Sequence, residues 1–365
     1  MKKYIYERAE WPDLDYDNGL LQKPLLELYH ALGKLFGKLD ALGFDVQDEL
    51  QLSAVSEDVM TSSEIEGEFL NRSSVKSSVA RKLGMEFAEM EEFSTDHYTD
   101  GVVEMALDAT LKYNAPLTSD RLFSWHSMLF PSGRSGLRKI TVGAYRTDDM
   151  RIVSGAVGRE RIHYVAPPPE RVPHEMDKFL KWVETEQGID PYIKAGLSHC
   201  LFESIHPFDD GNGRIGRAIV DLLLARAENS SKRYYSLSEQ FLKERKLYYS
   251  ELEAFQSYDG DVGKWLIWFL TSLTKAVHNS ERKIEESKQK AMLFDKWRNI
   301  AMSERQVVMI NKILAGFEGN VTAKKWAQIC KCSHDTALRD IDDLIVKGVL
   351  KRGTAGGRST SYELI

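Results

Sequence analysis

Leucine residues recur every three or four positions between residues 21 and 42, a spacing typical of one face of an amphipathic helix. The segment from Asp48 to Glu66 repeats the pattern, with Val55 and Val59 on its apolar face and Gly67 as the expected stop. Further helical patterns occupy residues 96–113, 119–130, 171–186, 190–205, 214–227, 240–256 and 261–292. The sequence therefore predicts a mainly α-helical fold.

Two short β-rich runs interrupt the helical pattern, one from Met150 to Val153 and the other from Ile162 to Val165. Glycines and charged residues separate the two runs, as in the turn of a β-hairpin. We therefore expect a small hairpin between two helical segments.

The pattern changes again from about Ser303, where three short helical segments precede a glycine-rich end. A helix, a helix-turn-helix and two short strands in this order predict a winged helix, with Ser333 as an N-cap and residues 336–347 as the recognition helix. The wing residues able to contact phosphates are Lys351, Arg352 and Arg358. The recognition helix also carries negative charge at Asp335, Asp340, Asp342 and Asp343. Docking to DNA and docking to a protein both stay open.

These changes in pattern predict several domains, and a chain of 365 residues with 42% hydrophobic content can bury two or three cores. We expect an N-terminal helical domain over residues 1–90 and a core that contains the hairpin over residues 91–280. A charged connecting helix would follow over residues 281–300, and the winged helix over residues 301–365.

The charge balance argues against nucleic-acid binding by the chain as a whole, because 49 basic and 55 acidic side chains leave a net charge of −6. Residues 301–365 differ, since 10 basic and 7 acidic residues give a net charge of +3 there and −9 elsewhere. The three cysteines lack a disulfide-type spacing, which is typical of a reducing compartment. No segment resembles a secretory signal or a membrane span, so we expect a cytoplasmic protein.

A loop with several reactive side chains joins two helical patterns between His206 and Arg217. Gly211 and Gly213 tolerate backbone angles that let main-chain N–H groups converge, and with the dipole of the next helix these groups would form an anion cradle. Arg214 and Arg217, one turn apart, can reach a polyphosphate from that helix. The loop therefore predicts a phosphate site.

Two more side chains add chemistry to this site. Asp210 adjoins the cradle, and Mg²⁺ prefers one or two carboxylates together with phosphate oxygens. His206 opens the loop, and a pKa near neutrality suits a base that takes a proton from a hydroxyl. The alternative is an ordinary turn with surface arginines and a core histidine. The ordered occurrence of all components within twelve positions favours a base, a metal site and a phosphate clamp.

The run from His206 to Arg217 resembles the signature of the Fic family, His-x-Phe-x-Asp/Glu-Gly-Asn-Gly-Arg-x-x-Arg, at every fixed position. The resemblance extends over roughly residues 90–280. It implies a Fic-type helical core that transfers AMP from ATP to Ser, Thr or Tyr hydroxyls of target proteins. It also implies that His206 is the base and that Asp210 binds Mg²⁺. Phosphate contacts would come from Gly211, Asn212, Gly213, Arg214 and Arg217.

The hairpin and a later helical segment resemble two further parts of the family. The hairpin is similar to the flap that pins a target protein beside the nucleotide, and an exposed strand edge suits the gripping of an extended segment. This resemblance places Arg161, Ile162, His163 and Tyr164 over the nucleotide. It also implies that the adenine and ribose are lined by Tyr248, Tyr249 and Gln256. Gln256 stands where Asn is common, and ordinary helix packing is an equal alternative for the tyrosines.

Ser62, Glu66 and Gly67 resemble the inhibitory pattern of the family, Ser/Thr-x-x-x-Glu-Gly/Asn. Glu66 ends a helix, where its charge opposes the helix dipole and an arginine partner would relieve the cost. Pairing with Arg217 would keep that arginine from the γ-phosphate, so the resemblance implies self-inhibition. The alternative is an exposed glutamate at a helix end. The N-terminal hundred residues are similar to the helical domain that precedes the core in some bacterial members.

Other functions stay compatible with the sequence. A DNA-binding regulator could use the core only to sense a nucleotide, although such a sensor would not need His206 as a base. An enzyme of the same fold could instead remove AMP, with Glu66 positioning a water molecule, or transfer another nucleotide. The sequence also leaves self-modification and a homodimer open.

Overall fold

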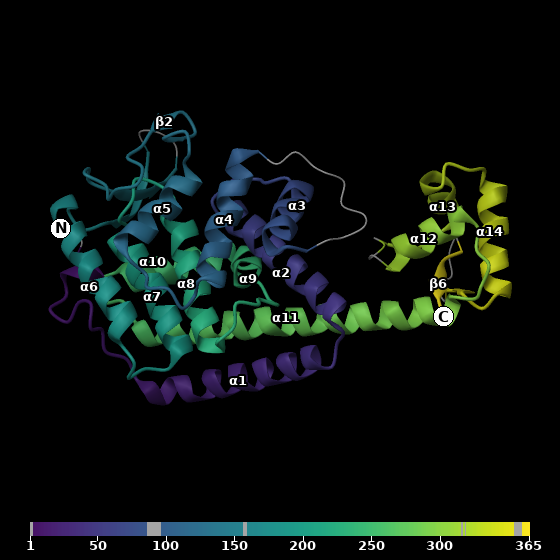
Figure 1. Ribbon diagram of the computed structural model, residues 1–365, viewed down its shortest axis with the longest axis horizontal. Helices are drawn as coiled ribbons and strands as arrows, with labels where there is room; N and C mark the ends of the chain where they lie inside the picture. Colours follow the sequence, from purple (N-terminus) through teal and green to yellow (C-terminus); the bar gives the residue numbers. More distant parts are fainter. Residues whose placement is uncertain (1–2, 86–95, 156–158, 315–316, 318, 354–359) are drawn as a thin grey trace. The chain divides into compact units, whose positions relative to one another are not determined.

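The computed structural model describes residues 3–85, 96–155, 159–314, 317, 319–353 and 360–365. The chain divides into two compact units, residues 1–282 and 283–365. The helices of the first unit are α1 (Asn18–Asp40), α2 (Phe44–Ile65), α3 (Arg72–Leu83), α4 (His97–Leu111), α5 (Ser119–Leu129), α6 (Val172–Thr185), α7 (Pro191–Ile205), α8 (Asn212–Glu228), α9 (Leu237–Lys243), α10 (Arg245–Gln256) and the first part of α11 (Val262–Trp297) (Figure 1). The predicted mainly α-helical fold is confirmed.

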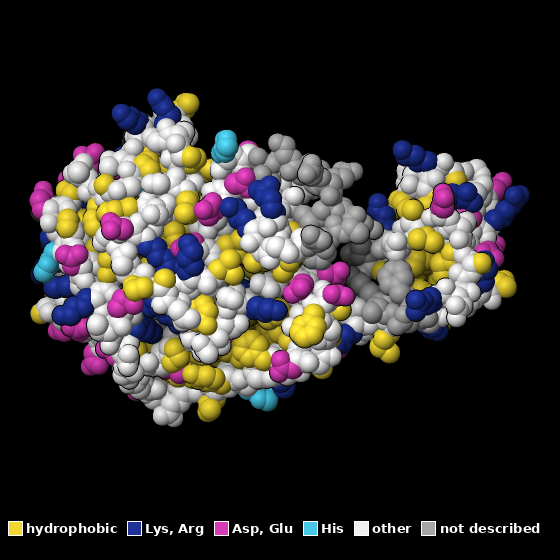
Figure 2. Space-filling model, in the orientation of Figure 1, with side chains coloured by type: hydrophobic (Ala, Val, Ile, Leu, Met, Phe, Trp, Pro, Cys, Tyr) yellow, Lys and Arg dark blue, Asp and Glu magenta, His cyan; other side chains and the backbone are white. Residues whose placement is uncertain are grey.

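Two small antiparallel strand pairs complete the first unit. The pair β3 (Arg151–Ser154) and β4 (Arg161–Val165) is the hairpin that the sequence predicted. The pair β1 (Arg134–Ser135) and β2 (Arg138–Lys139) was not predicted, because two residues per strand leave no readable alternation. Lys and Arg side chains gather where the β1–β2 hairpin lies at the top of the view (Figures 1 and 2).

The helices α7 and α8 form the centre of the first unit and pack against each other. Almost every residue of α7 from Tyr192 onward is buried, so other parts of the chain cover this helix on all sides. Gly196 allows α11 to come close, since a Cβ at this position would lie 2.8 Å from the ring of Phe269. Helices α2, α4 and α5 also contact α8. The loop between α7 and α8 is therefore held from several sides.

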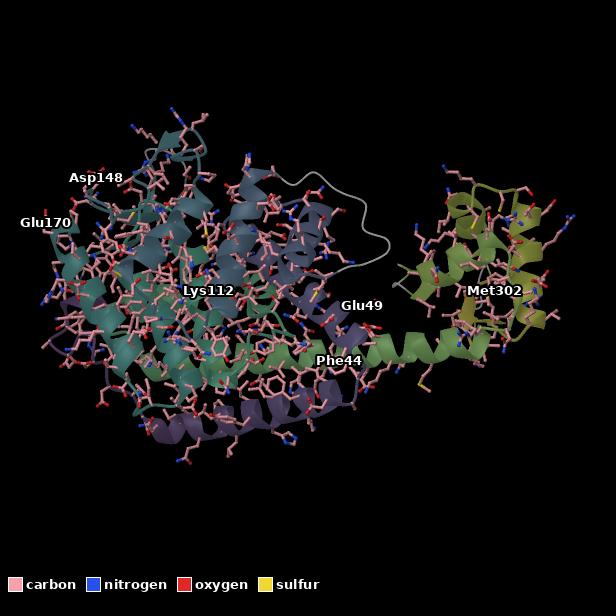
Figure 3. The ribbon with its side chains drawn as sticks, viewed as in Figure 1. Phe44, Glu49, Lys112, Asp148, Glu170 and Met302 are labelled. Carbon is pink, nitrogen blue, oxygen red and sulfur yellow. The ribbon has the colours of Figure 1, made fainter. Side chains whose placement is uncertain are left out.

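Three helix ends bring the candidate site together. α2 begins at the exposed Phe44 (Figure 3) and ends with Glu66 as its C-cap. α7 begins at the N-cap Asp190, whose carboxylate accepts hydrogen bonds from the first turn, and ends at His206. α8 begins directly after Gly211. The predicted segments for these helices agree with the structure to within a few residues.

The structure differs from the sequence prediction in three helices. α3 was not predicted, because Val75 and Val79 are its only large apolar residues that are buried. The segment 240–256 forms two helices, since the backbone leaves helical angles at Glu244 (φ −109°, ψ 26°). Residues 281–297 of the predicted connecting segment are part of α11, which begins at Val262.

The second unit contains α12 (Glu304–Leu314), α13 (Ala323–Ile329), α14 (His334–Val346) and an antiparallel pair of β5 (Leu350–Arg352) with β6 (Tyr362–Leu364). Trp326 and Leu344 are completely buried in its core. Arg358 of the predicted wing lies outside the described residues. Among the helices of the described residues, none is both long and apolar enough to cross a bilayer.

Candidate active site

The loop between α7 and α8 is held in one shape by its own residues. The backbone of His206 (φ 50°) and that of Gly211 (φ 82°) are both left-handed, a region that most side chains avoid. The buried Asn212 side chain spans the loop between them. It accepts a hydrogen bond from the N–H of Phe208 at 2.9 Å and donates one to the carbonyl of Phe208 at 2.8 Å. The main chain is thus fixed before any ligand binds.

The first turn of α8 presents backbone N–H groups that have no partner within the helix, which is a common anion-binding arrangement. The carboxylate of Glu66 lies directly over this turn, because a Cβ built on Gly213 would overlap its Oε1 atom. A residue larger than glycine at position 213 would therefore require the Glu66 carboxylate to move. The predicted phosphate cradle is next to a carboxylate of the same chain.

Glu66, at the end of α2, pairs with Arg217 of α8. Its Oε1 lies 2.8 Å from Nη2 of Arg217. The same guanidinium donates to the hydroxyl of Ser62 at 2.9 Å and to the Ser62 carbonyl at 2.7 Å. Burial is the largest single influence on the pKa of Arg217 and lowers it, but the charge and hydrogen bond of Glu66, together with the nearby Tyr248 and Tyr249, outweigh burial and raise that pKa overall. Gly67, with a left-handed backbone (φ 87°), ends the segment.

His206 lines the cavity with a neutral ring. Its Nδ1 lies 3.3 Å from the carbonyl oxygen of Glu203, so the proton of the neutral ring belongs on Nδ1 and the lone pair on Nε2. Burial is the main cause that lowers the pKa of His206 to about 4. At neutral pH the ring can therefore accept a proton.

Asp210 supplies a carboxylate to the same cavity. Its Oδ1 accepts a hydrogen bond from the N–H of Gly211 at 2.5 Å, and its Oδ2 contacts the hydroxyl of Ser135. The ring of His126 accepts from the N–H of Gly143 at 3.3 Å, so its other nitrogen donates to the carbonyl of Asp210 at 3.1 Å. The Asp210 side chain is 42% exposed. A carboxylate beside a phosphate cradle fits the ligand preference of Mg²⁺.

The two arginines of the signature are not among the residues that line the cavity. Arg217 is bound to α2 as described. Arg214 donates from Nη1 to the hydroxyl of Tyr98 at 2.6 Å, and its guanidinium lies 5.1 Å from the ring centre of Phe130. Its Nη2 lies 3.9 Å from Oδ1 of Asp210. Both guanidinium groups are therefore held by other side chains in this state.

A cavity of about 920 Å³ joins the signature loop, the β3–β4 hairpin and α10, and its volume is in the range of small-molecule sites. The predicted site residues that line it are Glu66, Arg161, His163, His206, Asp210, Gly211, Asn212, Gly213, Tyr248, Tyr249 and Gln256. The Tyr249 hydroxyl donates to the carbonyl of Ile65 at 3.1 Å, and Gln256 donates to the carbonyl of Glu203 at 3.2 Å. The structure thus brings most of the predicted residues together.

Ile162 and Tyr164 differ from the prediction, because neither lines the cavity. Tyr164 is completely buried, donates from its hydroxyl to the carbonyl of Ser204 at 2.6 Å and packs against Tyr4 and Tyr6. The reason is the alternation of side chains along a strand, which sends successive residues to opposite faces. Arg161 and His163 alone of this run reach the cavity.

Arg146 is a buried residue of the site that the sequence did not suggest. Its guanidinium donates to the carbonyls of His206 at 2.8 Å, Asp148 at 2.8 Å and Pro167 at 2.6 Å. Asp148, labelled in Figure 3, precedes β3, and Pro167 follows β4. Arg146 therefore ties both ends of the β3–β4 hairpin to the signature loop. Its partners are backbone carbonyls distant in sequence, so no local pattern signals its role.

Glu203 is a second residue of the site that the sequence did not suggest. It lies one turn before His206 on α7 and lines the cavity. Burial, together with the nearby charge of Glu66, raises the pKa of its carboxyl to about 8. A protonated acid at this position keeps the floor of the cavity from carrying a further negative charge.

Comparisons with known proteins agree with this geometry. Residues 116–224 match the Fic/DOC family, and residues 4–85 match a domain of unknown function (DUF4172). A probable protein adenylyltransferase of Aquifex aeolicus is 31% identical over 135 residues, which are 32% of this chain and 40% of the relative. A uridine 5'-monophosphate transferase of Xanthomonas campestris is 32% identical over 127 residues, which are 31% of this chain and 22% of the relative.

A solved structure extends the comparison to the fold. A Fic family protein from Desulfovibrio desulfuricans G20 has a TM-score of 0.56 and 18% identity, and the match covers 97% of this chain and 98% of that chain. The match to this chain covers 40% of the length of the Aquifex relative and 22% of the length of the Xanthomonas relative. The signature loop, the helices around it and the matched family model lead to one conclusion: this chain contains a Fic/DOC family domain at residues 116–224.

Proposed function

We propose that this chain is a protein adenylyltransferase that transfers AMP from ATP to a Ser, Thr or Tyr hydroxyl of another protein. One observation carries the proposal: a neutral histidine, a carboxylate and the amide end of a helix line a single cavity with the volume of a small-molecule site. The name of the Aquifex relative supports the same activity. The chain would thus be a nucleotidyltransferase with ATP as its substrate.

In the proposed reaction, Nε2 of His206 takes the proton of the target hydroxyl. The hydroxyl oxygen then bonds to the α-phosphorus of ATP, and the bond from this phosphorus to the β-phosphate oxygen breaks, so that pyrophosphate leaves. The amides of Gly211, Asn212 and Gly213 would hold the α-phosphate, and Arg214 and Arg217 the outer phosphates. Asp210 would hold Mg²⁺, which neutralises phosphate charge when bound.

Self-inhibition by Glu66 is part of the proposal. Ser62 and Glu66 hold Nε and Nη2 of Arg217, which would keep the guanidinium turned away from the outer phosphates, and the carboxylate over Gly213 repels an anion. Both contacts come from the end of α2. Movement of this end, with Gly67 as the turn that follows it, would free the cradle.

The β3–β4 hairpin is the proposed binding site for the target protein. Val153, which lines the cavity, is 48% exposed, and Ile162, which does not line it, is 43% exposed, so apolar side chains of both strands are accessible. An extended segment of a target could add to this hairpin through main-chain hydrogen bonds, which depend little on its sequence. Its hydroxyl would then lie over His206.

Transfer of UMP is the rival activity, since one of the relatives is a uridine 5'-monophosphate transferase. The test is to incubate the protein, Mg²⁺ and a cell lysate as the source of acceptor proteins with three labelled nucleotides in parallel. These are ATP labelled at the α-phosphate, ATP labelled at the γ-phosphate and UTP labelled at the α-phosphate. Relative to lysate without the protein, we expect the added protein to increase stable protein labelling from α-labelled ATP alone. An increase from UTP alone would establish the rival, and an increase from γ-labelled ATP alone would contradict both.

The pH dependence of the reaction should show a base with a lowered pKa. Burial is the main cause that lowers the pKa of His206 to about 4, and the charge of Glu66 works against this effect. In the Glu66→Gly variant, kcat/KM should therefore stay flat from pH 7 down to pH 5.5, because the ring stays unprotonated above its pKa. An ordinary histidine with a pKa of about 6.5 would lose about tenfold in this range. Such a loss would contradict the assignment of a neutral buried base.

We propose a winged helix for residues 301–365. The three helices and the β5–β6 pair occur in the order expected for this module. Two acidic residues of α14 are used inside the unit: Asp340 pairs with Arg305 at 2.9 Å, and Asp343 accepts from Gln306 at 2.7 Å. These contacts fasten α12 to α14. Negative charge at these two positions therefore argues less strongly against DNA binding than the sequence alone suggested.

The cytoplasm is the proposed location. Cys200 is buried and free, and Cys330 and Cys332 are free as well. Free thiols are typical of proteins in a reducing compartment. Cys200 in particular is fully covered by α7 and its neighbours, so it acts as a small apolar side chain of the core.

A further inference from the structure

A serine, a histidine and a glutamate outside the Fic signature form a hydrogen-bonded series on the wall of the cavity. The hydroxyl oxygen of Ser154 lies 2.6 Å from Nε2 of His163. Nδ1 of the same ring lies 2.7 Å from Oε2 of Glu253 on α10. Oε1 of Glu253 is held by Arg161 at 2.9 Å. Ser154, His163 and Glu253 all line the cavity that His206 lines.

The hydrogen bonds define the proton positions in this series. Glu253 can only accept, so the N–H of a neutral His163 ring points to it from Nδ1 and leaves the lone pair on Nε2. Burial would raise the pKa of Glu253, but hydrogen bonds from His163 and Arg161 lower it overall, so its carboxylate is ionised. In this tautomer the Ser154 hydroxyl donates to Nε2 of His163. A hydroxyl, a base and a group that orients the base are the arrangement of an activated nucleophile.

The strand pairing explains how His163 reaches Ser154. Ile152 pairs with Tyr164 and Val153 pairs with Ile162, so His163 is an extra residue without a partner across the hairpin. Such a β-bulge often redirects a side chain beside an active site. Ser154 pairs with Arg161, and directly opposed residues place their side chains on the same face. The bulge thus gathers three polar side chains of the hairpin on the cavity side.

We propose that Ser154 is an acceptor of AMP within this chain and that His163 is its base. The inference rests on the proposed function, because ATP in the cavity must supply the AMP. The proton of the Ser154 hydroxyl moves to Nε2 of His163 and the oxygen bonds to the α-phosphorus. The bond between this phosphorus and the β-phosphate oxygen breaks, and pyrophosphate leaves with the electron pair. The product is a phosphodiester that joins Ser154 to AMP.

The Ser154 step differs from transfer to other proteins in its base. His206 serves a hydroxyl that enters from outside, whereas Ser154 has a histidine of its own within hydrogen-bonding distance. A merely structural role is the competing explanation, in which the series fastens the hairpin to α10 and no covalent product forms. Chemical identification of the labelled residue separates the two explanations.

The test uses the full-length Glu66→Gly protein, in which the cradle is open, with Mg²⁺ and ATP labelled at the α-phosphate. A cell lysate supplies other acceptors, and peptide mapping by mass spectrometry locates the label on this chain. We expect the label on Ser154. A second substitution, Ser154→Ala, should remove this label, and His163→Gln should lower it by at least about tenfold, since general bases contribute that much or more.

Ser250 offers a matched control, because it is an exposed serine that lines the same cavity from α10. Among the described residues, no histidine is hydrogen-bonded to Ser250. Ser250→Ala should keep the label on Ser154. A further variant, His206→Asn in the Glu66→Gly background, should also keep it while lysate proteins lose theirs.

Two results would overturn the acceptor role while AMP transfer itself stands. The first is label on lysate proteins or on other residues of this chain with none on Ser154. The second is undiminished label on Ser154 after His163→Gln. If no protein in the reaction takes up α-label, the proposed function fails and the acceptor role fails with it.

Discussion

Replacing His206 by Asn should lower AMP transfer to other proteins by at least about a hundredfold, the lower end of the contribution of a general base. ATP should bind as before, because the ring acts on the hydroxyl and not on the nucleotide. Asn is the informative substitution, since the left-handed backbone at this position (φ 50°) tolerates Asn better than Ala. Label from α-labelled ATP measures transfer, and titration calorimetry measures binding.

His174 provides the control for this experiment. It is an exposed histidine in α6 and does not line the cavity, so His174→Asn should transfer AMP like the parent protein. Circular dichroism should show the same helical content for both variants. Transfer by a folded His206→Asn protein at the parental rate would show that another group, or water, takes the proton.

Glu66→Gly should raise AMP transfer by at least about tenfold, equivalent to about 1.4 kcal/mol of barrier. Two contacts are lost at once: the 2.8 Å pair with Arg217 and the carboxylate over Gly213. Arg217 can then turn to the outer phosphates, which aligns the α-phosphorus with the entering hydroxyl. Misplacement of a reacting atom by about 1 Å can cost on the order of a hundredfold in rate. A gain of at least about tenfold on correct alignment is well within that range.

Glu68→Gly tests whether the charge alone matters. Glu68 is exposed and lies two residues beyond Glu66, so its loss changes the net charge by the same amount without freeing Arg217. This variant should transfer AMP at the parental rate. An equal gain from both substitutions would indicate a general electrostatic effect, and no gain from Glu66→Gly would remove the basis for self-inhibition.

Much of the site could be predicted because its central residues are neighbours in the sequence. Twelve consecutive positions supply the base, the cradle and both arginines, and helical periodicity on either side locates the loop. The pairing of Glu66 with Arg217 is not local, and only the resemblance to a family pattern suggested it. The predicted hairpin also formed, because its two runs have clear β propensity.

The residues that support the site could not be predicted in this way. Tyr98 holds Arg214 from a helix more than a hundred positions earlier, and Arg146 contacts backbone carbonyls, which every residue has. The family resemblance also placed Tyr164 over the nucleotide, whereas its side chain is buried in the core. A bulge that brings His163 beside Ser154 changes the pairing by one residue, a shift that periodicity does not detect.

Arg146 has a consequence for how the protein would choose among hydroxyl groups. Its guanidinium donates hydrogen bonds to carbonyls at both ends of the β3–β4 hairpin and to the carbonyl of His206, so the hairpin and the proposed base are held at a fixed distance from each other. A target segment that pairs with the hairpin would therefore lie at a fixed distance from the ring of His206. Whether a hydroxyl group is modified would then depend on how far its oxygen projects from the backbone of the bound segment. Serine and threonine would present their oxygens at one depth and tyrosine at another, whatever residues flank them.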